Sequence, residues 1–334
     1  MAPPRRSHLY SGTEIRAELT AALEQVMAGD HVLITRHGKP VAALIGLGAY
    51  QQLTAPVSPA PQETVMQVIS VYNQAGGAGK TTITMNLGYA LKQRGFRVLL
   101  IDMDPQASLT RWLGLLTPTA EHPVPPAEKL SRTVFQVLSD PDEALPEPLS
   151  AFGLDVIPAN SKLSAGDSLL YSERERLTYL RRAIRARGGY DFVLLDGPPG
   201  RSALALAAVA ASDQLIIPIN VSKSMDNLGN VGEFLREARQ FSPDLSVLSL
   251  TMHSFMANTR HHQEMLKTVT EQLSAIAPAT TPITHKATLY NDAALYQQPV
   301  AVYAPHKSPR TEFDTLADEI LILLQMPERP EMVR

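Results

Sequence analysis

Residues 70–82 read SVYNQAGGAGKTT, and this segment restricts the possible folds more than any other part of the chain. Its glycines have no Cβ atoms, so backbone N–H groups can converge on phosphate oxygens. The apolar run QVISVY (67–72) before it predicts a strand, and TTITMNLGYALKQRG (81–95) after it predicts a helix that ends at Gly95. A strand, a glycine-rich loop and a helix N-terminus together bind phosphate groups. The sequence therefore predicts an α/β domain with a nucleotide site in this loop.

The side chains of this loop have separate roles in such a site. Lys80 would pair with the β- and γ-phosphates of ATP, and the Thr81 hydroxyl would ligate Mg²⁺. A glycine-rich turn without a ligand is the alternative, but the strand and the helix on either side favour the nucleotide site. The predicted nucleotide-binding residues are Gly76, Gly77, Ala78, Gly79, Lys80, Thr81 and Thr82.

Acidic residues follow two further strands that the sequence predicts. RVLLID (97–102) ends at Asp102, with Asp104 two residues later, and YDFVLLD (190–196) ends at Asp196. A single aspartate after a strand is usually a helix cap or a turn former. The carboxyl ends of parallel strands, however, surround the ligand crevice of an α/β sheet. Three aspartates at such positions behind a phosphate-binding loop therefore favour a role with Mg²⁺ and water.

Composition and charge exclude several classes of protein. The formal net charge of −3 argues against a generally polybasic nucleic-acid binder, so any DNA contact must come from local patches. The sequence has no cysteine, which excludes disulfides, thiolate zinc sites and iron–sulfur ligation. We see no apolar run of membrane-spanning length and no secretory signal at the start, and we therefore expect a cytoplasmic protein without membrane contact.

The position of a proline-rich stretch between two longer segments predicts two folded units. Residues 1–54 predict a small α+β domain, a proline-rich linker covers 55–65, and a large domain covers 66–327. In the small domain we expect a helix over 11–27, two strands joined by a turn at 37–39, and a short closing helix through Tyr50 and Leu53. So small a unit buries little surface, and we expect a partner chain. Ser11 and Glu14 have capping-box spacing, and the apolar stripe expected on the helix consists of Ile15, Leu19, Leu23 and Val26.

The small domain resembles the Phd/YefM antitoxin family. The resemblance rests on the S-x-x-E helix entry, on VLITRHGKPVAAL (32–44) and on the closing L-x-x-Y-x-x-L (47–53). It implies an obligate dimer that binds a palindromic operator, with basic residues that contact DNA phosphates. Solvated surface charges are the alternative for each of these residues. The candidate phosphate contacts are Arg5, Arg6, Arg16, Arg36 and Lys39.

The large domain resembles ParA-type partition ATPases, of the deviant Walker A class that includes the Soj and MinD proteins. The matching motifs are NQAGGAGKTT, VLLIDMDPQASLT, GLDVIPANSKL, YDFVLLDGPPG, SDQLIIPIN and QQPVAVYAPHKSPRTEFDTLADEI. The resemblance implies a P-loop NTPase fold with a mostly parallel central sheet flanked by helices. It also implies an ATP-bound homodimer that binds DNA without sequence preference, responds to a ParB-type centromere-binding protein, and associates with the nucleoid.

The same resemblance implies roles for individual residues. Asp104 would orient the attacking water, with Lys80 as the second catalytic residue, and Asp196 would bind Mg²⁺ through water. Asp102 would hold these residues in position without contacting the nucleotide itself, or it would face the dimer partner. Arg260 matches an arginine tied to nonspecific DNA binding, and a cationic patch around it could include His261, His262 and Lys267.

Ala75 departs from the family pattern, because this position is the signature lysine that reaches the partner's phosphates. Alanine leaves the phosphate-binding loop intact but removes that charge, so nucleotide binding should survive and hydrolysis should be slow. Arg201 is one candidate substitute, and a solvated surface arginine is the alternative. Two functions remain open: a partition ATPase that represses its own operon, or a nucleotide-responsive transcriptional regulator or antitoxin-like repressor with little or no hydrolysis.

Overall fold

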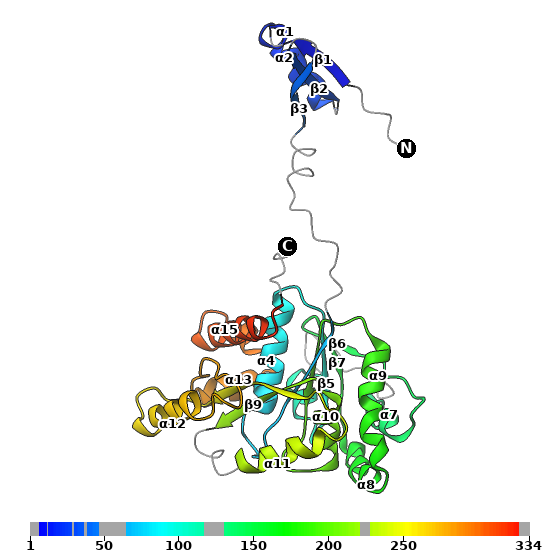
Figure 1. Cartoon of the computed structure of the whole chain (residues 1–334), viewed down its shortest axis with the longest axis vertical. Coiled ribbons are helices and arrows are strands. Elements are labelled where there is room, and N and C mark those ends of the chain that lie inside the picture. Colours follow the sequence, from blue (N-terminus) through cyan, green and yellow to red (C-terminus); the bar gives the residue numbers. More distant parts are fainter. Residues whose placement is uncertain are drawn as a thin grey trace. The chain divides into compact units, whose positions relative to one another are not determined.

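The computed structural model describes residues 7–11, 13–28, 30–36, 39–46, 65–116, 130–220 and 228–326 (Figure 1). The chain separates into two compact units, Met1–Thr64 and Val65–Arg334. The closing helix expected through Tyr50 and Leu53 and residues 55–64 of the expected linker lie outside the described residues.

The small unit contains a three-stranded sheet and two helices. Its elements are β1 (Ser7–Ser11), α1 (Glu14–Ala17), α2 (Leu19–Met27), β2 (His31–Arg36) and β3 (Lys39–Leu44). β1 pairs with β2 in parallel, and β2 pairs with β3 as the antiparallel hairpin that the sequence predicts. The Ser11 N–H donates to Glu14 Oε2 at 2.7 Å and the Glu14 N–H donates to Ser11 Oγ at 3.2 Å, which confirms the capping box.

The helix predicted over 11–27 is wrong in two respects. The chain leaves helical geometry at Glu18, where φ is −120°, so two helices replace one. The expected stripe is also only partly buried, because Leu19 and Leu23 are 49% and 45% exposed while Ala22 and Val26 pack with Val32. The local capping signal identified where the helix begins. The break at Glu18 has no equally local signal.

The large unit is built on a seven-stranded sheet with the order β10-β9-β4-β8-β5-β7-β6. All neighbouring strands are parallel except β6 and β7, and this sheet with helices on both faces confirms the predicted fold class. Its strands are β4 (Gln67–Val71), β5 (Val98–Asp102), β6 (Leu149–Ala151), β7 (Leu154–Ile157), β8 (Phe192–Asp196), β9 (Gln214–Asn220) and β10 (Ser246–His253). Its helices are α4 (Lys80–Gln93), α5 (Ser108–Trp112), α7 (Phe135–Ser139), η1 (Ser161–Ser164), α8 (Ala165–Ser172), η2 (Arg174–Thr178), α9 (Tyr179–Arg187), α10 (Ala203–Ala211), α11 (Leu228–Ala238), α12 (Arg260–Glu271), α13 (Ala287–Leu295), α14 (Val300–Tyr303) and α15 (Ser308–Leu323).

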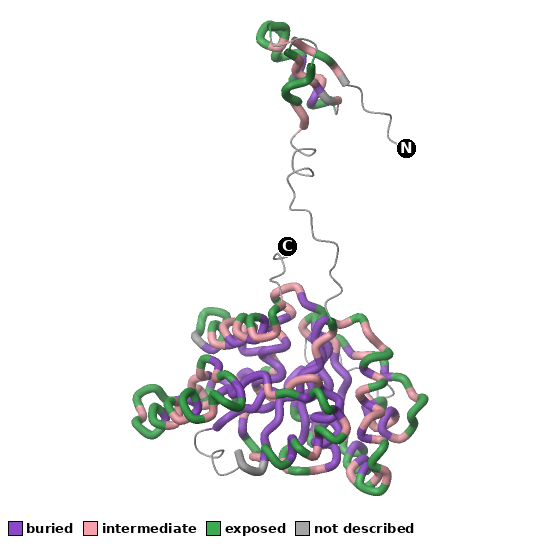
Figure 2. The backbone as a smooth tube through the Cα atoms, viewed as in Figure 1, coloured by how far each residue is buried: buried purple, intermediate pink, exposed green. Residues whose placement is uncertain are grey.

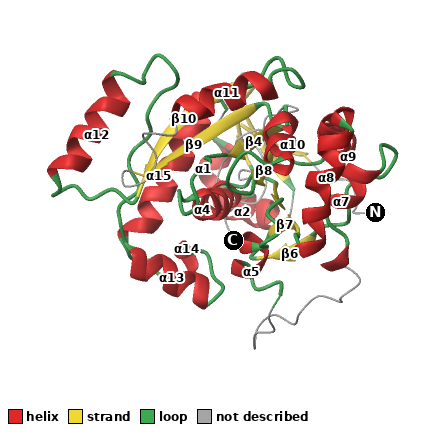
Figure 3. Cartoon of the chain, turned by 90° about the horizontal axis from the view of Figure 1, so that it is seen from below, coloured by secondary structure: helices red, strands yellow, loops and turns green. Residues whose placement is uncertain are grey.

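Two hydrophobic clusters cover the two faces of the sheet. Along β8, Phe192 and Leu194 pack into the cluster that includes α4 and α15, whereas Val193 and Leu195 pack into the cluster that includes α9 and α10. Figure 3 shows these helices on opposite sides of the sheet, and Figure 2 shows the buried strands between them. Burial on both faces explains why the parallel strands read as continuous apolar runs.

The carboxyl ends of β4, β5 and β8 meet at one edge of the sheet. Val71 and Asp102 are both register partners of Asp196, which places the phosphate-binding loop beside the two strand-end aspartates. This arrangement follows from the parallel pairing, because equivalent ends of parallel strands lie together. Among the helices that the structure describes, none is long and apolar enough to cross a membrane.

Candidate nucleotide-binding site

A cavity of about 400 Å³ lies at this edge of the sheet. The loop between β4 and α4 forms one wall, and Asp104 together with α5 forms another. Its described lining is Gly76, Gly77, Ala78, Gly79, Lys80, Thr81, Thr82, Asp104, Ser108, Arg111, Trp112, Pro199 and Ala294. The seven loop residues that the sequence predicts for nucleotide binding therefore line one cavity.

Lys80 lies within its own loop. Its side chain is largely buried, and Nζ donates to Asn73 O at 3.1 Å and to Ala75 O at 3.2 Å. Asn73 fixes the base of the loop, because its Nδ2 donates to Pro218 O at 2.7 Å and its Oδ1 accepts from the Ala75 N–H at 2.8 Å. Burial lowers the pKa of Lys80, and the nearby Asp196 opposes that shift. The loop thus holds a cation at the start of α4.

Thr81 and Asp196 form an oxygen pair that fits a magnesium ion. Thr81 Oγ1 donates to Asp196 Oδ2 at 2.7 Å. The other carboxylate oxygen, Asp196 Oδ1, is buried and has no hydrogen-bond partner among the described residues. Burial raises the pKa of Asp196, and the neighbouring Asp102 carboxylate raises it further. A hard cation would relieve both conditions, because Mg²⁺ prefers hydroxyl and carboxylate oxygens.

Asp102 and Asp104 differ in exposure although they lie two residues apart. Asp102 is fully buried and accepts from Thr110 N and Thr110 Oγ1 through Oδ2, at 2.9 and 2.7 Å, and from Asp104 N through Oδ1 at 3.1 Å. Asp104 is half-buried, lines the cavity, and accepts from the Gln106 N–H at 2.9 Å. Asp102 therefore holds the loop that presents Asp104 to the cavity, and as a fully buried side chain it has no surface to offer a partner.

His253 contacts the phosphate-binding loop from the end of β10, a neighbour that the sequence does not predict. A Cβ atom placed on Gly79 would lie 2.7 Å from His253 Cγ. Burial lowers the pKa of His253 to about 4, with a smaller effect from His285, so the ring is neutral near pH 7. At the end of β9, Asn220 Nδ2 donates to Gly77 O at 3.2 Å. The two strands on this side of β4, its neighbour β9 and the edge strand β10, thus both support the loop.

Substitution of Gly79 by alanine should destabilise the chain. Gly79 has a φ of +96° and its Cβ position is taken by His253, so the variant combines backbone strain with a clash. We expect the free energy of unfolding to fall by about 1–3 kcal/mol in chemical denaturation. Gly76 is the control, because its φ is not positive and nothing lies within 4 Å of its Cβ position. Equal effects of Gly79→Ala and Gly76→Ala would contradict this account.

Arg201 lies outside the described lining of the cavity. Its guanidinium pairs with Glu233 at 3.1 Å and with Glu237 at 3.7 Å, both on α11. The loop that carries it is tied to the phosphate-binding loop, because Gly200 N donates to Gln74 O at 2.9 Å. Arg201 therefore directly follows a residue that is bonded to the phosphate-binding loop, but its guanidinium pairs with two glutamates of α11 and does not line the described part of the cavity.

The candidate DNA-binding residues lie on the surface where they are described. Arg16, Arg36 and Lys39 are exposed, and Arg5 and Arg6 lie outside the described residues. Arg260 is 91% exposed and pairs with Glu264 at 2.8 Å. His261 and Lys267 are exposed as well. The inclusion of His262 in that patch is wrong, because His262 is buried and accepts from the Met256 N–H at 3.2 Å.

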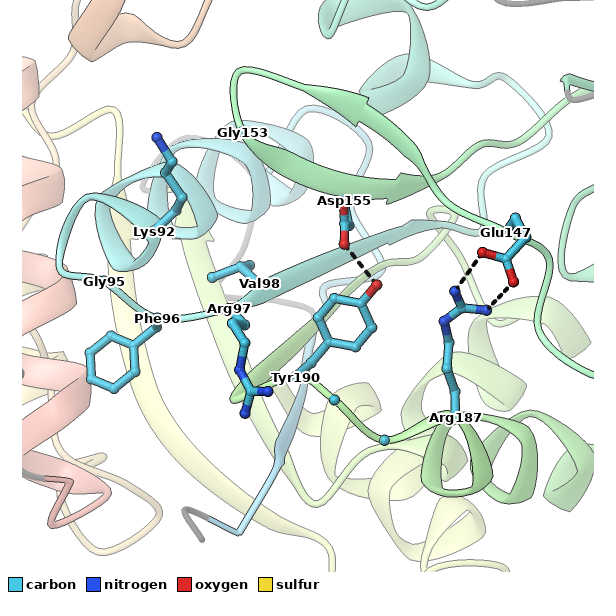
Figure 4. Close-up of a pocket in the computed structure, with 12 residues that line it drawn as sticks. Lys92, Gly95, Phe96, Arg97, Val98, Glu147, Gly153, Asp155, Arg187 and Tyr190 are labelled. Atoms are coloured by element: carbon cyan, nitrogen blue, oxygen red, sulfur yellow. Dashed lines mark hydrogen bonds and ion pairs between the residues drawn. The ribbon is translucent and has the colours of Figure 1, made fainter. Parts of the chain in front are cut away.

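A larger cavity, of about 610 Å³, lies at the amino ends of β5 and β8 (Figure 4). Four of its polar side chains bind one another in pairs: Arg187 pairs with Glu147 at 3.0 Å, and Tyr190 Oη donates to Asp155 Oδ2 at 2.8 Å. It is the larger of the two cavities, but the loop, the three aspartates and the helix N-terminus all lie at the opposite edge of the sheet. Size therefore does not identify the functional site here.

The fold and this site together define a P-loop nucleotide-binding protein. Residues 66–247 match a family model described as "AAA domain", and residues 8–60 match one described as "Antitoxin Phd_YefM, type II toxin-antitoxin system". The probable plasmid-partitioning protein ParA of Thermus thermophilus is 33% identical, over 76% of this chain and 78% of that protein. The sporulation initiation inhibitor protein Soj of Bacillus subtilis is 27% identical, over 76% of this chain and 98% of that protein. The chain belongs to the ParA family of P-loop ATPases and carries an N-terminal domain of the Phd/YefM antitoxin family.

A solved structure gives the same result for the large unit. Cobyrinic acid a,c-diamide synthase from Mycobacterium smegmatis, with a bound ATP analog and magnesium, superimposes with a TM-score of 0.65 at 26% identity. The match covers 80% of this chain and 100% of that structure. The similarity therefore extends over the whole P-loop domain, and that relative holds the ligands that the residues here would fit.

Proposed function

We propose that this chain is an ATP-dependent DNA partition protein that binds ATP and Mg²⁺ and hydrolyses ATP slowly. The observation that supports this most directly is the convergence of Lys80, Thr81 and Asp104 at one cavity, with Asp196 bonded to Thr81, in a member of the ParA family. The proposal extends to a homodimer whose nucleotide state controls nonspecific DNA binding by the large domain. A ParB-type protein is its proposed partner, and the cytoplasm and nucleoid its proposed location.

Each of the site residues has a defined task in hydrolysis. Lys80 and the loop N–H groups bind the phosphates, and Thr81 with Asp196 would hold Mg²⁺, whose positive charge would offset the negative charge of the phosphates. Asp104 accepts a hydrogen bond from the attacking water and orients it. The water oxygen bonds to the γ-phosphorus while the bond to the β–γ bridging oxygen breaks. ADP keeps that electron pair, and the released phosphate keeps the water's hydroxyl, while the water's other proton moves to a phosphate oxygen.

The experiment that tests the function measures ATP turnover by the purified full chain, alone, with DNA, and with DNA plus the product of a neighbouring gene. Turnover that rises with DNA and partner supports partition. Ala75 favours a second candidate, because a chain without a cation at this position can bind nucleotide and still turn over little. Nucleotide-dependent operator binding without turnover would support that candidate, a transcriptional regulator, and would contradict partition.

The two domains should differ in how they bind DNA. We propose that the small domain, residues 1–54, binds an operator as a dimer and represses its own operon. In the full chain, Arg36→Ala with Lys39→Ala should weaken operator binding, whereas Arg260→Ala should weaken nonspecific binding in the presence of ATP. Loss of one phosphate contact should lower the slope of log affinity against log salt by about 1. A mobility-shift titration at several salt concentrations measures both effects.

A matched arginine controls the second half of this prediction. Arg310 also pairs with an acidic residue four positions later, Asp314, so Arg310→Ala removes the same type of exposed ion pair. It should leave DNA binding unchanged. Equal losses for Arg260→Ala and Arg310→Ala would mean that net charge, and not a site, governs nonspecific binding. The absence of a protected sequence upstream of the gene would contradict autorepression.

A further inference from the structure

Arg111 is a cation in the nucleotide cavity for which neither the sequence motifs nor the comparisons give a role. It lies on α5 and is exposed. Lys80 and Arg111 are the two residues with a positive side chain in the described lining of this cavity. Their environments differ, because Lys80 is buried among carbonyl oxygens of its own loop. Arg111 is therefore the more accessible positive charge in the cavity.

The guanidinium of Arg111 has almost no competing interactions. Nη2 donates to Gln106 O at 3.4 Å, a long contact at the outer limit of a hydrogen bond. Within the described ranges, no carboxylate lies at ion-pair distance from it. Arg201, by contrast, is held by Glu233 at 3.1 Å. An arginine that lines this cavity without a carboxylate partner has most of its five donors available for an anion.

The backbone on both sides of Arg111 is anchored, which fixes where its side chain begins. Thr110 donates to the buried Asp102 through N and Oγ1, at 2.9 and 2.7 Å. Trp112 Nε1 donates to Gln298 O at 2.9 Å. The Arg111 N–H itself donates to Ala107 O at 2.9 Å. Since Asp102 also holds the loop that presents Asp104, the cation and the water-orienting carboxylate share one support.

We propose that Arg111 contacts the terminal phosphate of ATP and supplies the positive charge that Ala75 lacks. The inference rests on the proposed function, because it assigns a further residue to the same hydrolysis. As the bond between the γ-phosphorus and the β–γ bridging oxygen breaks, negative charge develops on the leaving ADP and on the transferring group. Arg111 stabilises that charge by hydrogen bonds and gives up no proton, since a guanidinium does not act as an acid near neutral pH.

The test compares Arg111→Ala with Arg111→Lys in the full chain. Arg111→Ala should lower turnover about 10²–10³-fold, the loss typical for removal of one donor to developing charge. Arg111→Lys should retain more activity, because the charge remains while the planar geometry is lost. Arg132→Ala is the control: Arg132 is also an exposed arginine, pairs with Glu143 at 2.9 Å, and lies outside the described lining of the cavity. It should turn over ATP at the parent rate.

A charge introduced at position 75 separates this role from a structural one. Ala75→Lys should restore turnover to the Arg111→Ala chain and should raise the turnover of the parent chain by a smaller factor. A purely structural defect at α5 would not respond to a lysine placed on another loop. Failure of Ala75→Lys to raise the turnover of the Arg111→Ala chain would therefore overturn the inference, as would parent-like turnover in Arg111→Ala itself.

Binding measurements keep the inference testable even if the parent chain shows no hydrolysis. Calorimetry with a non-hydrolysable ATP analogue and with ADP gives the preference for the terminal phosphate. Arg111→Ala should reduce this preference at least about tenfold, because one charge-assisted contact is lost. If the parent chain does not hydrolyse ATP and Arg111→Ala still reduces this preference, the result would contradict the proposed hydrolysis and support the contact. An unchanged preference would overturn the contact, whether or not the parent hydrolyses ATP.

Discussion

Replacement of Lys80 by alanine is expected to weaken ATP binding at least about 100-fold, because two or more charge-assisted hydrogen bonds to phosphate, each worth about 1.5–3 kcal/mol, are lost. Lys80 is the cation of the phosphate-binding loop, and its Nζ lies between two loop carbonyls at 3.1 and 3.2 Å. Phosphate oxygens would therefore meet an ammonium group that is already positioned. Isothermal titration calorimetry of the full chain with ATP and Mg²⁺ measures the affinity.

The fold must survive for this result to be informative. Lys80 is largely buried and burial lowers its pKa, so its removal relieves a desolvation cost while it leaves two carbonyl oxygens without a donor. Chemical denaturation without nucleotide should show a folded chain. Lys162→Ala, at an exposed lysine on η1, is the control and should bind ATP like the parent. An unchanged ATP affinity of the Lys80→Ala variant would contradict the assignment of the nucleotide site to this loop.

Substitution of Asp104 by alanine should lower ATP turnover about 10²–10⁴-fold, because the attacking water loses the carboxylate that orients it. ATP affinity should change little, since Asp104 contacts the water and not the phosphates. The effect appears in single-turnover assays with DNA present, while calorimetry of the same variant checks that nucleotide still binds. The combination of intact binding with lost turnover is the expected result.

Asp140 provides a closely matched control for that variant. Asp104 accepts from the N–H of Gln106 at 2.9 Å, and Asp140 accepts from the N–H of Asp142 at the same distance. Both aspartates therefore stabilise the same kind of local turn, but only Asp104 lines the cavity in its described part. Asp140→Ala should keep parent turnover. If both variants lost activity equally, the turn and not the carboxylate chemistry would be responsible.

Much of the large domain could be predicted because its signals are local. The apolar runs ending at Val71, Asp102 and Asp196 are buried on both faces and therefore read as strands without any tertiary information. The residues of the loop after β4 that would bind phosphate are close neighbours in the sequence, so the sequence alone reveals them. Parallel pairing then brings the strand ends together, so the meeting of Asp102 and Asp196 follows from the predicted fold class.

The neighbours of the loop could not be predicted in the same way. Gly79 and His253 are far apart in the sequence, and their contact depends on where β10 lies in the strand order. Arg111 directly follows the motif VLLIDMDPQASLT, which ends at Thr110, but its exposure to the cavity depends on the hydrogen bonds of Thr110 and Trp112. In the small domain, strand β1 forms by pairing with His31–Arg36, which no local pattern at Ser7–Ser11 reveals.

Trp112 gives this chain a built-in optical reporter. It is the only tryptophan of the sequence, and its indole lines the nucleotide cavity while Nε1 is bonded to Gln298 O. Indole emission responds to the polarity around the ring and to nearby charged quenchers, and excitation at the red edge of the absorption band avoids the tyrosines. The intrinsic emission of the unlabelled full chain therefore comes from the cavity alone. Stopped-flow recordings of that signal would resolve nucleotide arrival and release in real time, without any dye attached to protein or ligand.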